Sequence, residues 1–124
     1  MNMNKSDNES RRLIQNQYFI NENKLIQYIE WDALARISFI NCNFKKLHLL
    51  GKVFGSCSFQ NCTFNYFSAR KGKFSSCDFD SCKLETTRFL KSNLNLILVE
   101  NVKVWESKEW VEIEDFSSFQ NPNR

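Results

Sequence analysis

The chain has 124 residues, of which 42% are hydrophobic and 25% charged, a composition typical of one soluble folded domain. Twelve phenylalanines accompany only 3 glycines and 1 proline, which excludes a fold whose turns depend on those two residues. The net charge of +3 is too small to indicate nucleic-acid binding by itself, and an odd number of cysteines, five, argues against a complete disulfide framework.

The N-terminal segment is polar and lacks the apolar core of a signal peptide. No stretch approaches the roughly 18 apolar residues that a membrane-spanning helix needs. We therefore expect a cytoplasmic protein without a membrane span, with residues 1–12 disordered.

Residues 13–36 are predicted to cover the start of the fold. A helix is expected at about 23–36, with Asn21 or Asn23 as its N-cap, and residues 18–20 are expected to form a short strand or a hydrophobic staple before it. The helix prediction rests on a stripe of apolar residues at helical spacing, namely Leu25, Ile26, Ile29, Ala33 and Leu34.

A period of five organises residues 37–106. The middle residue of each five is apolar fourteen times in succession: Phe39, Phe44, Leu49, Phe54, Phe59, Phe64, Ala69, Phe74, Phe79, Leu84, Phe89, Leu94, Val99 and Val104. A helix repeats at 3.6 residues and a strand at 2, so neither explains this period. A coil with four sides of five residues does, and 70 residues make about three and a half coils stacked roughly 4.8 Å apart.

A second inward position lies two residues before each central one. It holds small or apolar residues with the exception of Lys52, and it contains all five cysteines. Cys57 and Cys77 then stack in one column, and Cys42, Cys62 and Cys82 in another. Linear columns do not offer the tetrahedron that zinc needs, and buried thiols lack the setting of a reactive thiolate. We interpret the cysteines as packing residues and expect no metal or cofactor.

The segments CNFKK, CSFQN, CTFNY, CDFDS, CKLET and SNLNL resemble the motif of the pentapeptide-repeat family: a small residue, a polar residue, Leu or Phe, and two variable residues. The resemblance covers about 70 residues. It implies an all-β solenoid, a right-handed quadrilateral β-helix. It also implies two properties of some members: modulation of bacterial type II topoisomerases by DNA mimicry, and dimerisation through the C-terminal end.

Residues 107–124 are predicted to form a C-terminal cap and tail. An aromatic and aliphatic set in this segment and immediately before it could cover the last coil or form a dimer surface. We favour the cap, and hence a monomer. The set comprises Trp105, Trp110, Val111, Ile113, Phe116 and Phe119.

No catalytic constellation can be assembled, since the single histidine, His48, is predicted to point outward; we therefore expect a protein that is not an enzyme. Residues 37–106 hold ten basic and five acidic side chains. Six of the basic residues are predicted to form a candidate binding patch: Lys52, Arg70, Lys71, Lys73, Arg88 and Lys91.

The preferred hypothesis is a rigid protein-interaction or structural module with a protein partner. One alternative is a DNA mimic acting on DNA gyrase, which the positive charge of the repeats disfavours. Another is a binder of nucleic acid or another polyanion through the basic patch, with Tyr66 as the best outward aromatic for base stacking. The many Asn, Lys, Ile and Phe residues favour a bacterial source.

Overall fold

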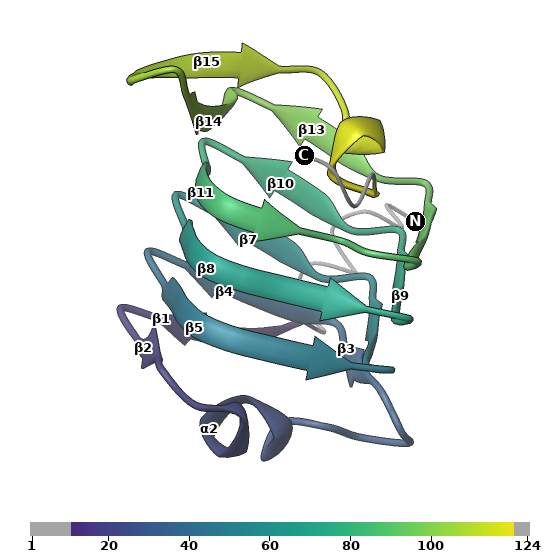
Figure 1. Ribbon diagram of the computed structural model, residues 1–124. Helices are drawn as coiled ribbons and strands as arrows, with labels where there is room; N and C mark the ends of the chain where they lie inside the picture. The colour runs from purple at the N-terminus through teal and green to yellow at the C-terminus, as the bar shows by residue number, and fades with distance from the viewer. Residues whose placement is uncertain (1–10, 121–124) are drawn as a thin grey trace, which may run out of the picture.

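The computed structural model describes residues 11–120, which form a right-handed β-solenoid with very little helix (Figure 1). The long strands β5 (Asn43–Leu50), β8 (Thr63–Arg70) and β11 (Lys83–Arg88) run from left to right across the front of Figure 1. The chain climbs from α2 (Glu22–Ile26) at the bottom to β15 (Glu109–Ile113) at the top, which makes the winding right-handed. Within residues 11–120, no helix is long and apolar enough to cross a membrane.

Three sheets make the four sides of each coil. The first side consists of β1 (Arg12–Gln15), β4 (Ile37–Ile40), β7 (Ser58–Gln60), β10 (Asp78–Asp80) and β13 (Leu98–Glu100). The second and third sides share one sheet that contains β2 (Tyr18–Phe19), β5, β8, β11, β14 (Val102–Glu106) and β15. The fourth side consists of β3 (Leu34–Ala35), β6 (Val53–Gly55), β9 (Lys73–Ser75) and β12 (Asn93–Asn95).

Parallel pairing with a register of 20 residues confirms the predicted period. Phe39 lies opposite Phe59, and Phe59 opposite Phe79. Of the fourteen central residues, twelve are buried, and Leu94 and Val99, in the last coil and a half, are partly buried. Phenylalanine rings stack from coil to coil with centroids 5.0 Å apart for Phe39–Phe59 and 4.6 Å for Phe59–Phe79. This spacing is close to that of hydrogen-bonded strands, so the ring columns and the backbone ladder reinforce each other.

The corners explain how the chain turns with so few glycines. The second residue after each central one, from Asn41 to Asn101, has a φ angle between 51° and 66°. Among these thirteen corners only Gly51 is a glycine. Corner amides also join the coils; for example, the Asn41 N–H donates to the Gln60 carbonyl over 3.0 Å. The left-handed conformation is unfavourable for most side chains, so the stacked ladder has to hold these corners in place.

The small inward residues act as hydrogen-bond donors as well as packing groups. The Cys57 thiol donates to the Leu34 carbonyl over 3.2 Å, and the Cys82 thiol to the Phe59 carbonyl over 3.2 Å. The hydroxyls of Thr87 and Ser92 reach the equivalent carbonyls of Phe64 and Ala69. Each of these groups therefore satisfies a carbonyl of the preceding coil.

Gly72 holds a position where no larger residue fits. A Cβ atom on Gly72 would lie 2.6 Å from the Lys52 carbonyl oxygen, directly below it in the same column. The Gly72 N–H donates to the hydroxyl oxygen of Ser92 in the coil above over 3.2 Å. The glycine thus allows the coils to approach closely on the fourth side.

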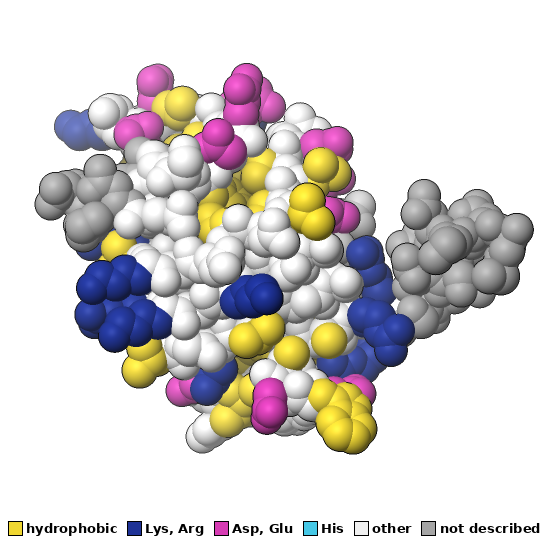
Figure 2. All heavy atoms as spheres, turned by 90° about the vertical axis from the view of Figure 1, so that its right-hand side faces the viewer, with side chains coloured by type: hydrophobic (Ala, Val, Ile, Leu, Met, Phe, Trp, Pro, Cys, Tyr) yellow, Lys and Arg dark blue, Asp and Glu magenta, His cyan; other side chains and the backbone are white. Residues whose placement is uncertain are grey.

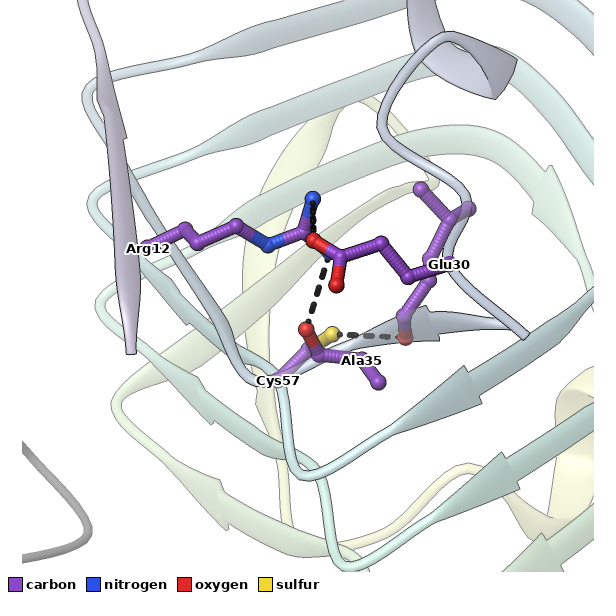
Figure 3. Close-up of polar contacts among 5 residues, drawn as sticks. Arg12, Glu30, Ala35 and Cys57 are labelled. Carbon is purple, nitrogen blue, oxygen red and sulfur yellow. Dashed lines mark hydrogen bonds and ion pairs between the residues drawn. The ribbon is translucent and has the colours of Figure 1, made fainter. Parts of the chain in front are cut away.

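The solenoid begins earlier than we predicted. Residues 12–36 form a further coil, in which β1 and β2 pair with β4 and β5 at an offset of 25 residues, whereas β3 pairs with β6 at 20. Arg12, expected in the disordered segment, starts β1; the rest of that expectation, for residues 1–10, lies outside the described residues. Arg12 braces this coil with an ion pair to Glu30 over 2.9 Å and a hydrogen bond to the Ala35 carbonyl (Figure 3).

The N-terminal helix is confirmed as a cap but is much shorter than the predicted 23–36. It is a single turn with Asn21 as N-cap, and Leu25 points fully buried into the core. After the C-cap Gln27 the chain makes three-residue turns, in which the Tyr28 and Ile29 N–H groups donate to the Leu25 and Ile26 carbonyls. A tight turn follows at Trp31 and Asp32, with φ angles of 53° and 65°, so no helix can extend to residue 36. Leu34 is then buried in β3 against the next coil, so pairing with β6 overrides the helical stripe.

The C-terminal end is closed by a hairpin and a 3₁₀ turn. β14 and β15 pair antiparallel around Ser107 and Lys108, whose φ angles are 52° and 66°. The 3₁₀ helix η1 (Ser117–Gln120) places Phe119 against the core, and the Phe116 ring lies 4.8 Å from Phe79 and 5.1 Å from Phe89. The predicted cap is therefore intramolecular for these two phenylalanines.

Candidate interaction surfaces

Three of the six predicted basic residues meet at one edge of the solenoid. Lys71 and Lys91 are corner residues one coil apart, with φ angles of 54° and 52°. Arg70 ends β8 immediately before this corner, and all three side chains are exposed. The Lys71 N–H donates to the Leu90 carbonyl over 3.0 Å, so the backbone ladder fixes the spacing of the charges. We call Arg70, Lys71 and Lys91 the basic corner.

The other three residues do not share that environment. Lys52 forms an ion pair with Glu22 of the N-terminal cap over 3.3 Å. Lys73 is exposed in the middle of the fourth side. Arg88 points outward from the third side and lines a cavity of about 350 Å³ together with Glu106 and Phe119. The six predicted residues are therefore divided among four local environments and do not form one surface.

Charge is separated along the solenoid axis. Figure 2, which faces the fourth side, shows Lys and Arg side chains gathered at both borders of this face and Asp and Glu side chains gathered at its upper end. Residues 11–96 carry thirteen basic and six acidic side chains, whereas residues 97–120 carry two basic and six acidic ones. The coils are consequently positive and the C-terminal end negative.

The aromatic C-terminal set divides into an inner and an outer group. Phe116 and Phe119 are buried in the cap, and Val111 and Ile113 pack against the core while partly exposed. Trp105 and Trp110 lie opposite each other in the hairpin with ring centroids 5.3 Å apart, and they remain 42% and 38% exposed. The Lys83 Nζ atom lies 5.1 Å from the centroid of the Trp110 ring, a cation–π contact.

The outer surface of the second side contains a groove that our sequence reasoning missed. It has a volume of about 320 Å³ and runs across successive coils from Tyr18 in β2 to Trp110 in β15. The period of five predicts that Lys45 and Lys83 face outward here. It does not predict that the chain reverses at Ser107, which is what returns Trp110 over Lys83. The sequence signal for this hairpin would have been a two-residue turn between Trp105 and Trp110 whose residues readily adopt positive φ angles.

The cysteines form two hydrogen-bonded columns inside the solenoid. All five are free and buried, and among residues 11–120 no group of His, Cys, Asp and Glu is placed to hold a metal ion. The hydrogen bonds with Cys42 and Cys82 raise the pKa of the Cys62 thiol, and burial adds to this. The hydrogen bond with Cys57 raises the pKa of Cys77 in the same way, again with burial acting in the same direction. The same contacts act in the opposite direction on the neighbouring thiols. The hydrogen bond with Cys62 lowers the pKa of Cys42 to about 7 and also lowers the pKa of Cys82, and the hydrogen bond with Cys77 lowers the pKa of Cys57.

His48 lies on the outer surface, as predicted. Its Nδ1 atom is 2.9 Å from the Ser68 hydroxyl oxygen one coil above, and both side chains belong to the third side. The two side chains thus form a polar contact between neighbouring coils on the outer surface.

Comparisons with known proteins leave the family open. No family model matches the chain, and no curated protein matches it. Among solved structures, the chain is similar to a protein from Parabacteroides merdae ATCC 43184 described as a "putative glycosyl hydrolase", with 13% sequence identity and a TM-score of 0.33. The match covers 83% of this chain and 64% of that one, less than two thirds of its length. A likeness of this size carries no argument about function.

Proposed function

We propose that this chain is a non-enzymatic binding module of the pentapeptide-repeat kind, whose basic corner contacts an acidic surface of a protein partner. The observation that carries the proposal is the column formed by Arg70, Lys71 and Lys91 on a backbone fixed by hydrogen bonds between coils. A charged surface that is already ordered loses little entropy on binding, so it can discriminate between partners by charge pattern.

The cellular setting of this proposal is the bacterial cytoplasm. The five cysteines are free and inward-facing, which suits a reducing compartment. Ring stacking through successive coils makes the scaffold stiff, and stacked repeat proteins use such extended sides for binding.

The test is affinity purification from the native host with three baits. The first is the wild-type chain, and the second carries Arg70→Glu, Lys71→Glu and Lys91→Glu. The third carries Lys45→Glu, Lys46→Glu and Lys103→Glu, an equal charge change on the second side. We expect a protein that is retained by the first and third baits and lost from the second, and whose purified form binds with an affinity that falls as salt rises. Equal retention by all three baits would refute a role for the basic corner.

A further inference from the structure

We propose that the outer face of the second side binds single-stranded nucleic acid, with bases stacked on its aromatic rings and phosphates beside its lysines. This goes beyond the proposed function because it concerns another surface and another class of partner. We call this surface the lysine–aromatic face. Its members are Tyr18, Lys45, Lys46, Tyr66, Lys83, Lys103, Trp105 and Trp110.

Register places these residues side by side across the coils. Tyr18 pairs with Asn43, Asn43 with Thr63, Thr63 with Lys83, and Lys83 with Lys103, so these five form one outward column. Lys45 and Asn65 pair with each other in a second column, which Glu85 continues. Lys46 and Tyr66 are corner residues one coil apart at the border of this side. The hairpin places Trp105 and Trp110 at the upper end of the columns.

The four aromatic side chains are unusually accessible for their size. Tyr18 is 65% exposed, Tyr66 51%, Trp105 42% and Trp110 38%. Flat rings of this kind offer stacking surfaces that accept any base. The hydrogen-bonded backbone already holds these rings in outward positions, so binding does not require the backbone to become ordered.

The groove between the columns adds polar groups to the stacking surfaces. Its floor is formed by the backbone of Phe44 and Phe64, and Lys45 and Lys83 lie on its two sides. The Oδ1 atom of Asn65 is buried there and has no hydrogen-bond partner within the described part of the chain. A buried carbonyl oxygen without a partner is unfavourable, and once the amide turns into the groove the N3–H of a thymine or uracil base can donate to it.

The combination of groups favours nucleic acid over an acidic peptide. Four lysines attract either ligand, but Glu85 and Glu112 also face outward here, so the excess positive charge is only +2. Affinity therefore has to come largely from the four rings, and a peptide of acidic residues has no aromatic ring to stack on them. Duplex DNA is disfavoured for the same reason, since its bases are stacked on each other.

The test measures fluorescence anisotropy of a labelled dT12 strand at 50 mM NaCl, with rU12 and a 12-base-pair duplex as comparison ligands. We expect dT12 and rU12 to bind and the duplex to bind at least tenfold more weakly; if only one of the two strands binds, that result identifies the sugar. In a Trp31→Phe background, which removes the 96% exposed Trp31, binding should quench the emission of Trp105 and Trp110. Raising the salt should weaken binding with a slope set by a few phosphate contacts.

Variants assign the binding to this face. Tyr66→Ala and Trp110→Ala should each weaken binding at least about fivefold, the lower end for loss of one stacked base. Tyr66→Phe and Trp110→Phe should bind like the wild type, because each keeps an aromatic ring. If the alanine variants had failed through loss of a hydroxyl or indole hydrogen bond, the phenylalanine variants would fail as well. Lys45→Glu with Lys83→Glu should weaken binding and flatten the salt dependence. The basic-corner triple variant, Arg70→Glu with Lys71→Glu and Lys91→Glu, should bind within twofold of the wild type.

Three results would overturn the proposal. One is no anisotropy change at 100 μM protein in 50 mM NaCl. Another is equal loss of binding in the basic-corner variant, which would assign the effect to general positive charge. The third is equally effective competition by a poly-glutamate peptide, which would indicate an acidic protein segment as the ligand. None of these results bears on the proposed protein partner, which is tested on the basic corner.

Discussion

Single residues at the corners carry a conformational cost that the stacked coils offset. Asn and Gly are at ease with φ near +55°, but this chain also uses Thr86 at 52° and Leu96 at 53°. A β-branched side chain is the least suited to this conformation. The backbone at Thr86 is therefore strained, and a residue that adopts positive φ more readily would relieve that strain.

Replacing Thr86 with Asn should accordingly stabilise the protein. We expect Thr86→Asn to raise the free energy of unfolding by about 0.5–1 kcal/mol, because Asn adopts the left-handed region more readily than the β-branched Thr. Urea unfolding followed by circular dichroism measures the change. The matched control is Ser76→Thr at an equivalent exposed corner with φ 55°, which should lower stability. Equal stability of all three proteins would show that the corners are not strained.

The small inward residues form a second set in which single atoms matter. Thr87 and Ser92, on the third and fourth sides, already place hydroxyls at the position where the first and second sides place thiols. The carbonyl of Phe39, which accepts from Cys62 over 3.4 Å, would accept equally well from a serine hydroxyl. What this position requires is a small donor.

Cys62→Ser should therefore be tolerated within about 1 kcal/mol, whereas Cys62→Val should cost about 1–3 kcal/mol, since it leaves the buried Phe39 carbonyl without its donor. The pH dependence provides a second readout. The folded-state pKa of Cys62 is raised above its ordinary value of 9.0, so the unfolded chain releases the proton first. The stabilisation is complete below pH 9.0 and declines as pH rises above it. Unfolding between pH 8 and pH 10.5 should show a shallower decline for Cys62→Ser than for the wild type; parallel curves would contradict the raised pKa.

At the scale of elements, the two ends behave differently from the middle. The middle coils pair only with copies of the same pattern, whereas each end needs a cover. Leu25 of α2 supplies one cover, and Phe116 and Phe119 supply the other. The Phe119 carbonyl also accepts from the Phe89 N–H over 3.0 Å, which satisfies part of an open strand edge.

Phe116→Ala should uncover the last complete coil. The ring stacks on Phe89 and meets Phe79 edge-on, so we expect a loss of about 3–5 kcal/mol in the free energy of unfolding. Leu96→Ala is the control, because Leu96 is 74% exposed and should change stability by less than about 0.5 kcal/mol. Both are measured by urea unfolding. A loss below 1 kcal/mol for Phe116→Ala would mean that the 3₁₀ segment does not close the core.

The elements also show where sequence reasoning succeeds and where it stops. The uninterrupted spacing of five predicted the coils from Ile37 onward, with the identity of their inward residues. The first coil escaped because its five extra residues break the phase: Ile14 pairs with Phe39 at an offset of 25, although Leu34 pairs with Phe54 at 20. The apolar residues from Leu25 to Leu34 do have helical spacing, but this local pattern does not show that Leu34 belongs to a strand. The groove depends on the reversal at Ser107, a contact between segments that no periodicity encodes.

At the scale of the whole molecule, the position of the aromatic residues bears on self-association. The residues that could have formed a large apolar dimer surface are divided, since Phe116 and Phe119 are already buried within one chain. Trp105 and Trp110 remain outside, but the same end carries Glu106, Glu109 and Glu112. Two such ends would repel each other.

We therefore expect a monomer. Gel filtration with light scattering at 10 and 200 μM should give the mass of a single chain at both concentrations. Raising the salt to 0.5 M screens the repulsion between the acidic ends, so it is the condition most favourable to association through the tryptophans. A dimer there that Trp110→Ala abolishes would show that the hairpin is a self-association surface held open by charge.

The separation of charge along the solenoid axis predicts how the protein affects DNA gyrase. A rod that imitates DNA has to present negative potential along its sides, because the enzyme surface that holds DNA is positive. Here residues 11–96 have seven more basic than acidic side chains, and only the last segment, residues 97–120, is acidic, with an excess of four. The sides would therefore be repelled from a DNA-binding groove.

In a supercoiling assay, DNA gyrase should be unaffected by 10 μM protein. The comparison is a variant with Arg70, Lys71, Lys91, Lys45 and Lys46 changed to Glu, whose sides are negative. Inhibition by the wild type equal to or greater than that by the variant would show that the charge of the sides does not decide the interaction.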